Sequence, residues 1–248
     1  MQSEEYELMA AAEDHMWWFT GLHDWMLDRI QKLSLPAGAK VLDCGAGTGG
    51  FARKLGSRFP TLRIFAVDLD AGAIRYFRQK SANPVIRGSV NDLAYSDDSF
   101  DAVVSSDLLY HSAVDERQAL RELYRTMRPG AHLLLNLPAY SWMKSTHDEK
   151  VHAARRYTSR GIAETLTRAG FSVEEASYRN SLLFPVMAVW RLTLGRFSAG
   201  SDVTDFPAWQ EFLFGKAIRA ENSLARRGVR FPFGGSVYAH AIKPRVPN

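Results

Sequence analysis

A glycine-rich stretch, Val41 to Gly50, carries the residues with the clearest chemical meaning in this sequence. The apolar residues from Val41 predict a buried strand, and Gly45 and Gly47 let the chain turn sharply against a ligand before a helix begins. Asp43 in this crevice needs a positive or hydrogen-donating partner, because burying a carboxylate without one is costly. The glycine spacing also satisfies a dinucleotide fingerprint, so the stretch predicts a nucleotide-type site without choosing its ligand.

A second acidic residue follows at the distance expected for ribose recognition. Ile64 to Val67 predicts another buried strand, and Asp68 comes directly after it. This places Asp68 about twenty residues past the glycines, where a carboxylate can accept hydrogen bonds from ribose hydroxyls.

Five stretches in a fixed order extend this pattern over roughly residues 38 to 137. They are the glycine run from Asp43 to Gly49, Val67-Asp68, Gly88-Ser89 before Asn91-Asp92-Leu93, Phe100 to Val104, and Met127 to Ala131. In this order they resemble the class I S-adenosylmethionine-dependent methyltransferases. The resemblance implies an α/β fold with a Rossmann-like, seven-stranded, mostly parallel sheet and helices on both faces. It also implies S-adenosyl-L-methionine as cofactor and S-adenosyl-L-homocysteine as product.

The resemblance assigns the cofactor-binding residues by matched position. Gly45 and Gly47 would pass under the methionine part of the cofactor, and Asp43 would meet its amino group directly or through water. Asp68 would hold the ribose hydroxyls. The other candidates for this site are Leu69, Ser89 and Val90 (the last two at the adenine), Asp107 near the methionine end, and Trp17 and Trp18 from an aromatic arm. Aromatic faces attract a sulfonium cation, which gives such an arm a reason to close over the cofactor.

The bulk properties are compatible with this interpretation. The 248 residues, 46% of them hydrophobic, can fill one α/β core, and the net charge of +4 is too small to indicate a nucleic-acid binder. The single cysteine, Cys44, excludes an internal disulfide and favours a reducing, cytoplasmic location. We expect no metal, no signal peptide, and either a monomer or a homodimer.

The chain is expected to form one methyltransferase domain, 1–248, with two additions to its core. Residues 1–35 predict a helical arm, residues 36–178 and 234–248 the core sheet, and residues 179–233 a helical insertion between the sixth and seventh strands. We expect strands near 40–44, 64–68, 84–87, 100–105, 131–137, 171–178 and 235–242, the last antiparallel between the fifth and sixth. The expected helices lie near 50–58, 71–80 and 115–127, with another after Thr158 as cap.

The insertion opens with the most apolar run of the protein, Leu182 to Trp190. Pro185 and Arg191 interrupt it far short of a bilayer span, so no integral membrane segment is expected. The run favours a helix packed on the sheet with a lid role; a dimer seam and a peripheral membrane contact are alternatives. A second helix is expected from Glu221 to Arg230, with its arginines facing solvent.

Methyl transfer from a sulfonium needs an in-line approach of the acceptor more than it needs acid–base help. An acceptor that carries a proton also requires a base, and histidine suits that task near neutral pH. His111 is the first candidate, because it follows the carboxyl end of the fourth strand, where open α/β sheets place ligands. The other catalytic candidates are His15, His147, His152 and Tyr157.

The acceptor is expected to be a small organic molecule with an oxygen, nitrogen, sulfur or carbon nucleophile. Methyltransferases that act on the amino groups of nucleobases usually carry an Asn/Asp-Pro-Pro-aromatic motif after the fourth strand, but Ser105 to Tyr110 contains no proline. Methylation of a pyrimidine carbon needs a nucleophilic cysteine, and the chain has none at such a place. No nucleic-acid partner is therefore expected. An NAD-dependent oxidoreductase and a non-catalytic cofactor-binding partner subunit remain as alternatives.

Overall fold

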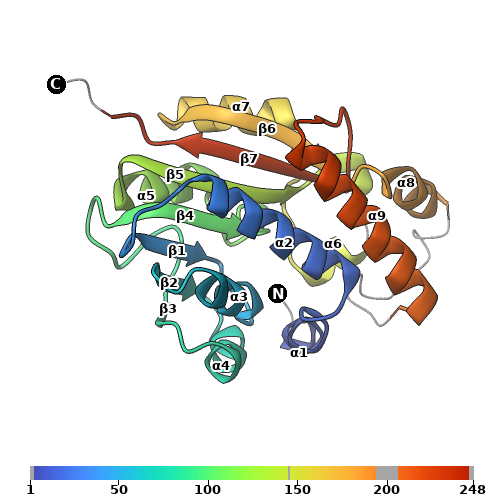
Figure 1. The fold of residues 1–248 in the computed structure, drawn as a ribbon, viewed down its shortest axis with the longest axis horizontal. Coiled ribbons are helices and arrows are strands. Elements are labelled where there is room, and N and C mark those ends of the chain that lie inside the picture. The colour runs from blue at the N-terminus through green and yellow to red at the C-terminus, as the bar shows by residue number, and fades with distance from the viewer. Residues whose placement is uncertain (1–2, 145, 194–205, 246–248) are drawn as a thin grey trace.

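The computed structural model describes residues 3–144, 146–193 and 206–245. One sheet has the strand order β3-β2-β1-β4-β5-β7-β6 (Figure 1). Its strands are β1 Lys40–Cys44, β2 Arg63–Asp68, β3 Val85–Arg87, β4 Phe100–Ser106, β5 Met127–Pro138, β6 Ser172–Arg179 and β7 Ser236–Ile242. Strands β1 to β5 pair in parallel, whereas β7 runs antiparallel between β5 and β6. The predicted topology is confirmed.

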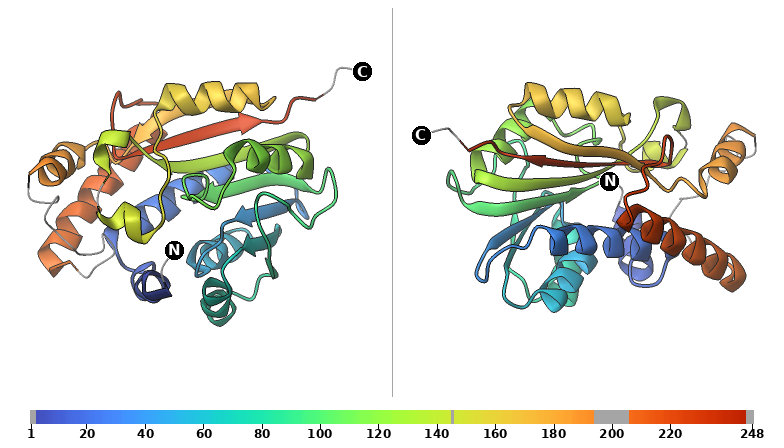
Figure 2. Two further views of the ribbon diagram at one scale, coloured as in Figure 1. Left: turned by 180° about the vertical axis from the view of Figure 1, so that it is seen from behind. Right: turned by 45° about the horizontal axis from the view of Figure 1, so that its top comes forward.

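Helices cover both faces of this sheet, as Figure 2 shows from two further sides. They are α1 Ser3–Ala12, α2 Trp17–Lys32, α3 Gly50–Arg58, α4 Ala71–Lys80, α5 Glu116–Thr126, the 3₁₀ turn η1 Ser141–Met143, α6 Thr146–Lys150, α7 Ser159–Arg168, α8 Phe184–Leu192 and α9 Ala208–Arg226. Neighbouring strand residues point to opposite faces. Leu42 therefore joins the core under α5 and α7, whereas Val41 joins the core under α2 and α3.

Local capping explains where several helices begin. The side chain of Asp115 accepts a hydrogen bond from the backbone N–H of Gln118 at 3.0 Å, and Thr158 does the same for Gly161 at 3.0 Å. Both caps were expected from the sequence, because a short polar side chain satisfies a backbone donor that the first helical turn leaves open.

Two expectations about boundaries are corrected. Strand β5 begins at Met127, not near 131, because Met127 pairs with Phe100 across a register shift before the regular ladder starts. Helix α9 begins at Ala208, well before Glu221, since it packs along α2. Ile218 occupies the space beside Gly21 at this contact. Only tertiary packing makes the longer helix favourable.

Helix α8 also differs from its expected packing, because none of its residues is buried. Val186, Val189 and Trp190 are more than half exposed, at 62%, 63% and 53%. The helix lies beyond the end of the sheet, beside η1, so it does not pack on the strands (Figure 1).

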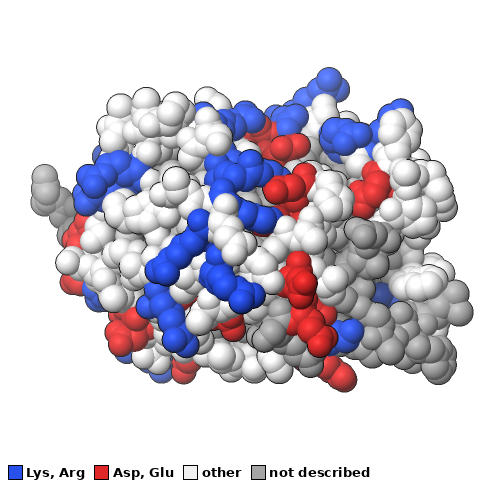
Figure 3. All heavy atoms as spheres, turned by 90° about the horizontal axis from the view of Figure 1, so that it is seen from below, with Lys and Arg blue, Asp and Glu red and all other residues white. Residues whose placement is uncertain are grey.

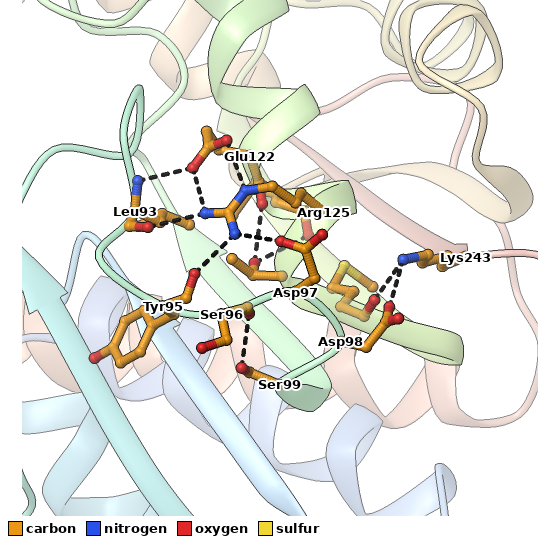
Figure 4. A network of polar contacts seen from close by, with 12 residues as sticks. Leu93, Tyr95, Ser96, Asp97, Asp98, Ser99, Glu122, Arg125 and Lys243 are labelled. Carbon is orange, nitrogen blue, oxygen red and sulfur yellow. Dashed lines mark hydrogen bonds and ion pairs between the residues drawn. The ribbon is translucent and has the colours of Figure 1, made fainter.

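A polar network around Arg125 secures the connection between β3 and β4 (Figure 4). The guanidinium donates to Glu122 of its own helix, to Asp97 at 2.7 Å, and to the backbone carbonyls of Leu93 and Tyr95. Beside it, Lys243 pairs with Asp98 at 2.8 Å. These contacts hold the loop against α5 at the end of the sheet where β4 begins, so they serve the scaffold.

We expect Gly49→Ala to destabilise the fold more than Gly38→Ala. Both glycines have positive φ, 90° and 80°, and left-handed alanine costs about 1–2 kcal/mol at either site. A Cβ on Gly49 would lie 2.8 Å from Cδ2 and 3.0 Å from Cα of Phe77, whereas Gly38 has open space. The clash adds about 1–3 kcal/mol, measurable by urea unfolding. Equal losses for the two variants would contradict the close packing of the loop on α4.

Candidate functional site

A cavity of about 940 Å³ opens at the carboxyl ends of β1, β2 and β4. This is the edge of an open α/β sheet at which ligands bind. One end of the cavity is lined by the glycine loop from Asp43 to Thr48, with Asp68, Ser89 and Val90. The other end reaches α8 and α9 of the insertion, and helix α1 contributes to the wall through Tyr6 and Met9.

Asp43 is the buried acidic residue of the glycine loop. It is 4% exposed, and its Oδ2 atom has no hydrogen-bond partner in the described part of the chain. Burial, together with the carboxylates of Asp68 and Glu13, raises the pKa of Asp43 to about 8. A buried carboxyl of this kind favours a cationic ligand, because a positive charge would stabilise its ionised form.

Asp68 fixes the glycine loop through its carboxylate. Its Oδ2 accepts from the backbone N–H of Gly47 at 2.8 Å, and its Oδ1 accepts from the N–H of Asp70 at 2.9 Å. Burial raises the pKa of Asp68, and these backbone donors oppose that effect. Leu69, 53% exposed, lies next to it at the cavity rim. The loop and the second strand are thus joined at the cavity wall.

Helix α1 lies directly over the glycine loop. The Met9 methyl group would be 2.9 Å from a Cβ placed on Gly47. Glu13 accepts from the N–H of Gly50 at 3.1 Å, and it pairs with Lys80 of α4 at 2.6 Å. Sequence reasoning missed Tyr6, Met9 and this role of Glu13. Nothing in the spacing of α1 relates it to residues forty or seventy positions away, so only the acidic pair at its end hinted at an ionic contact.

The two predicted arm tryptophans line the cavity from α2. The Trp17 ring meets Phe214 of α9 edge-on at 5.4 Å between centroids, and Trp18 packs on Phe19 in the same way at 4.9 Å. The backbone N–H of Trp17 donates to Glu211 at 2.8 Å. The arm and the insertion therefore form one continuous wall.

The end of the cavity away from the glycine loop is mainly apolar. Its lining includes Met143, Met187, Trp190, Phe206 and Phe214.

A buried ion pair crosses this apolar end. Arg156 donates to both carboxylate oxygens of Asp148, at 2.8 and 2.9 Å, and to the carbonyl of Ala139 at 3.0 Å. Arg191 of α8 donates to the carbonyl of Met143 at 2.7 Å. These contacts join the loop after β5 to the insertion.

His111 lies at the cavity, as its place after β4 predicted. Its Nδ1 atom lies 2.7 Å from the carbonyl oxygen of Val151, so Nδ1 carries the proton in the neutral ring. Burial lowers the pKa of His111 to about 4. The ring stacks on Tyr110 at 4.3 Å. His111 is therefore a neutral, weakly basic side chain at pH 7.

Of the other catalytic candidates, His15, His152 and Tyr157 do not line the cavity. His15 and His152 are exposed and are not among the residues that line the cavity. The side chain of His147 falls outside the described residues. The Tyr157 hydroxyl donates to Glu116 at 2.7 Å and lies 3.1 Å from the carbonyl of Leu109, so it holds the loop in place at a distance from the cavity lining.

Metal binding and membrane spanning concern the whole described part of the chain. Among the described residues, no group of three or more His, Cys, Asp or Glu side chains is arranged to hold a metal ion, and no helix is long and apolar enough to cross a bilayer.

The lower face, to which α3 and α4 contribute, mixes Lys and Arg with Asp and Glu (Figure 3). Arg53 of α3, for example, forms an ion pair with Asp14 at 2.7 Å. The oligomeric state and a peripheral membrane contact stay predictions.

Comparison with known proteins identifies the glycine loop and its strands. Residues 42–135 match the profile of a methyltransferase domain. The chain is similar to the ubiquinone/menaquinone biosynthesis C-methyltransferase UbiE of Geotalea daltonii, at 27% identity over 119 residues, which are 45% of this chain and 50% of that protein. The chain thus spans about half the length of this and other curated relatives that it matches.

Solved structures share the fold over most of the chain. One is a chain assigned as a methyltransferase, in complex with the Haloferax volcanii Trm112 methyltransferase activator. It has a TM-score of 0.63 at 20% identity, and the alignment includes 99% of this chain and 96% of that one. A Haemonchus contortus phosphoethanolamine N-methyltransferase with bound S-adenosyl-L-methionine has a TM-score of 0.58 at 19% identity, over 89% of this chain and 52% of its own. The methyltransferase domain matched over residues 42–135, together with this fold, supports a class I S-adenosylmethionine-dependent methyltransferase.

Proposed function

We propose that this protein transfers a methyl group from S-adenosyl-L-methionine to a small, largely apolar organic acceptor. The observation that carries the proposal is the buried Asp43 carboxyl in the glycine loop, whose Oδ2 has no hydrogen-bond partner among the described residues, at one end of a cavity whose other end is apolar. The cofactor supplies a methyl carbon bonded to a positively charged sulfur. Asp43 suits the ammonium group of such a ligand, because this contact would stabilise the ionised carboxyl.

Other residues that line the cavity are suited to the ribose and adenine of the cofactor. Asp68 would accept hydrogen bonds from ribose hydroxyls with the carboxylate lone pairs that Gly47 and Asp70 leave available. Ser89 and Val90 would border the adenine, since both line the cavity beyond Asp68. Helix α1 would cover the cofactor through Tyr6 and Met9, which excludes water from the transfer.

The acceptor class follows from the far end of the cavity. Met187 and Trp190 from α8 and Phe214 from α9 would contact an apolar body, while Trp17 and Trp18 would separate it from the cofactor. Two relatives have names that refer to quinones: UbiE of Geotalea daltonii is a ubiquinone/menaquinone biosynthesis C-methyltransferase, and a Clavibacter sepedonicus protein is a demethylmenaquinone methyltransferase. We therefore propose a lipophilic ring compound as acceptor.

Cofactor binding tests the proposal directly. We expect the wild-type protein to bind S-adenosyl-L-methionine and S-adenosyl-L-homocysteine in calorimetric titration and not to bind NAD. Asp68→Ala should weaken both by about tenfold to hundredfold, as for the loss of a hydrogen bond to a charged group worth about 1.5–3 kcal/mol. Asp97→Ala is the matched control, because Asp97 is exposed and lies outside the cavity lining. Binding of NAD alone would overturn the proposal, and unchanged affinity in Asp68→Ala would remove this residue from the site.

A further inference from the structure

Asp107 stands where the acceptor would meet the cofactor. It follows the last residue of β4, beside β1, which carries Asp43 at the same edge of the sheet, and both residues line the cavity. Its backbone N–H donates to the carbonyl of Asn136 at 2.8 Å, and its φ of 52° turns the chain sharply after the strand. This turn sets the side chain at the edge where ligands bind.

The carboxylate of Asp107 is held by an amide instead of a cation. Asn136, 1% exposed, places its Nδ2 atom 3.3 and 3.2 Å from the two carboxylate oxygens. Arg156 is the nearest cation that acts on it, but that guanidinium already makes two hydrogen bonds to Asp148. An amide donor orients a carboxyl group and still allows it to take up a proton.

The groups around Asp107 set its proton affinity near neutral pH. Burial raises the pKa of Asp107 to about 7, while Asn136 and the Arg156 charge oppose that rise. Burial and the Asp107 charge in turn raise the pKa of the Tyr110 phenol. His111, in contrast, has its pKa lowered to about 4. A general base works best when its pKa lies near the working pH, so the carboxyl is better suited than the imidazole.

We infer that Asp107 is the general base for methyl transfer to an acceptor that carries an ionisable O–H group. This inference rests on the proposed function and narrows it to phenol-like or hydroquinone-like acceptors. The proton moves from the acceptor O–H group to Asp107, and the electron pair left on that oxygen forms the bond to the methyl carbon. The bond between that carbon and sulfur breaks, with its electron pair going to sulfur. Asp107 then returns the proton to water.

The first test titrates Asp107 without any acceptor. In NMR spectra of protein labelled with ¹³C at the aspartate carboxyl carbons, the Asp107 resonance is identified as the one that is missing from the Asp107→Asn spectrum. In the wild type this resonance should titrate with a midpoint near pH 7. A midpoint below pH 5 would overturn the inference. Binding of S-adenosyl-L-homocysteine to Asp107→Asn should stay within threefold of wild type. If binding is weakened but turnover at saturating S-adenosyl-L-methionine is normal, Asp107 is a cofactor ligand, and the base role is overturned.

The second test follows turnover with a defined probe, 1,4-dihydroxynaphthalene kept reduced. Wild-type turnover should rise with pH through a midpoint near 7. Asp107→Asn should be at least a hundredfold slower and lose this dependence, whereas His111→Gln should keep it. A pH dependence that survives in Asp107→Asn and disappears in His111→Gln would overturn the inference. If the protein binds the cofactor but methylates only acceptors without an O–H group, the inference fails while the proposed function stands; without cofactor binding, the proposed function fails.

Discussion

Asp43→Asn should weaken S-adenosyl-L-methionine binding by about a hundredfold at pH 8. The carboxyl is buried in the glycine loop without a partner for Oδ2, so an ammonium group there gains a charged hydrogen bond worth about 3 kcal/mol, or about two factors of ten in affinity. Asparagine has nearly the same shape and lacks the charge. The measurement is calorimetric titration, with Asp92→Asn as control, because Asp92 is exposed and does not line the cavity.

The same residue predicts how binding depends on pH. The pKa of Asp43 is about 8, so below pH 8 the carboxyl is mostly protonated and must lose its proton to meet a cation. Wild-type affinity should therefore rise from pH 6 to pH 8 and level off above that, with a proton released on binding. Titrations in two buffers of different ionisation enthalpy measure this release. Wild-type affinity that stays flat over this range would show that Asp43 is already ionised, or that it does not contact the ammonium group.

Glu221→Ala should lower the free energy of unfolding by about 3–5 kcal/mol, the usual effect of leaving one partner of a buried ion pair alone. Glu221, 1% exposed, accepts hydrogen bonds from the backbone N–H groups of Asn180, Ser181 and Leu182 at 2.7, 2.6 and 3.0 Å. It also lies 3.7 Å from Arg179, whose guanidinium packs over the Trp25 ring at 3.8 Å.

The variant would remove the negative charge beside Arg179, which keeps its hydrogen bond to Asn222, and would leave three backbone donors without their acceptor. Burial already lowers the pKa of Arg179 to about 10, and the Glu221 charge acts against that. Urea unfolding followed by tryptophan fluorescence measures the loss. Glu164→Ala is the matched control, since its ion pair with Arg160 is exposed on α7, and its unfolding midpoint should stay at the wild-type value. A similar midpoint for both variants would contradict the anchoring role of Glu221.

The sequence determined the sheet and the cofactor loop because both depend on local patterns. An apolar run of a few residues predicts a buried strand, and a short polar side chain such as Asp115 or Thr158 caps the helix that follows it. The spacing of Gly45 and Gly47 after Asp43 predicted the loop directly, because the sharp turn needs positive φ angles within a few residues and glycine adopts them easily. The antiparallel place of the seventh strand between the fifth and sixth then followed from the family resemblance.

Tertiary structure decided which side chains face one another and how strongly each holds a proton. Glu13 reaches Gly50 and Glu221 reaches Asn180, and no periodicity connects positions so far apart in the chain. His111 and Asp107 lie four residues apart, and their side-chain types alone favour the imidazole as the base at neutral pH. Burial reverses that order, because it removes water that would stabilise the imidazolium and the carboxylate. The desolvation of each group depends on the whole fold around it, and this is why the proton affinities of Asp107 and His111 could not be predicted from the sequence.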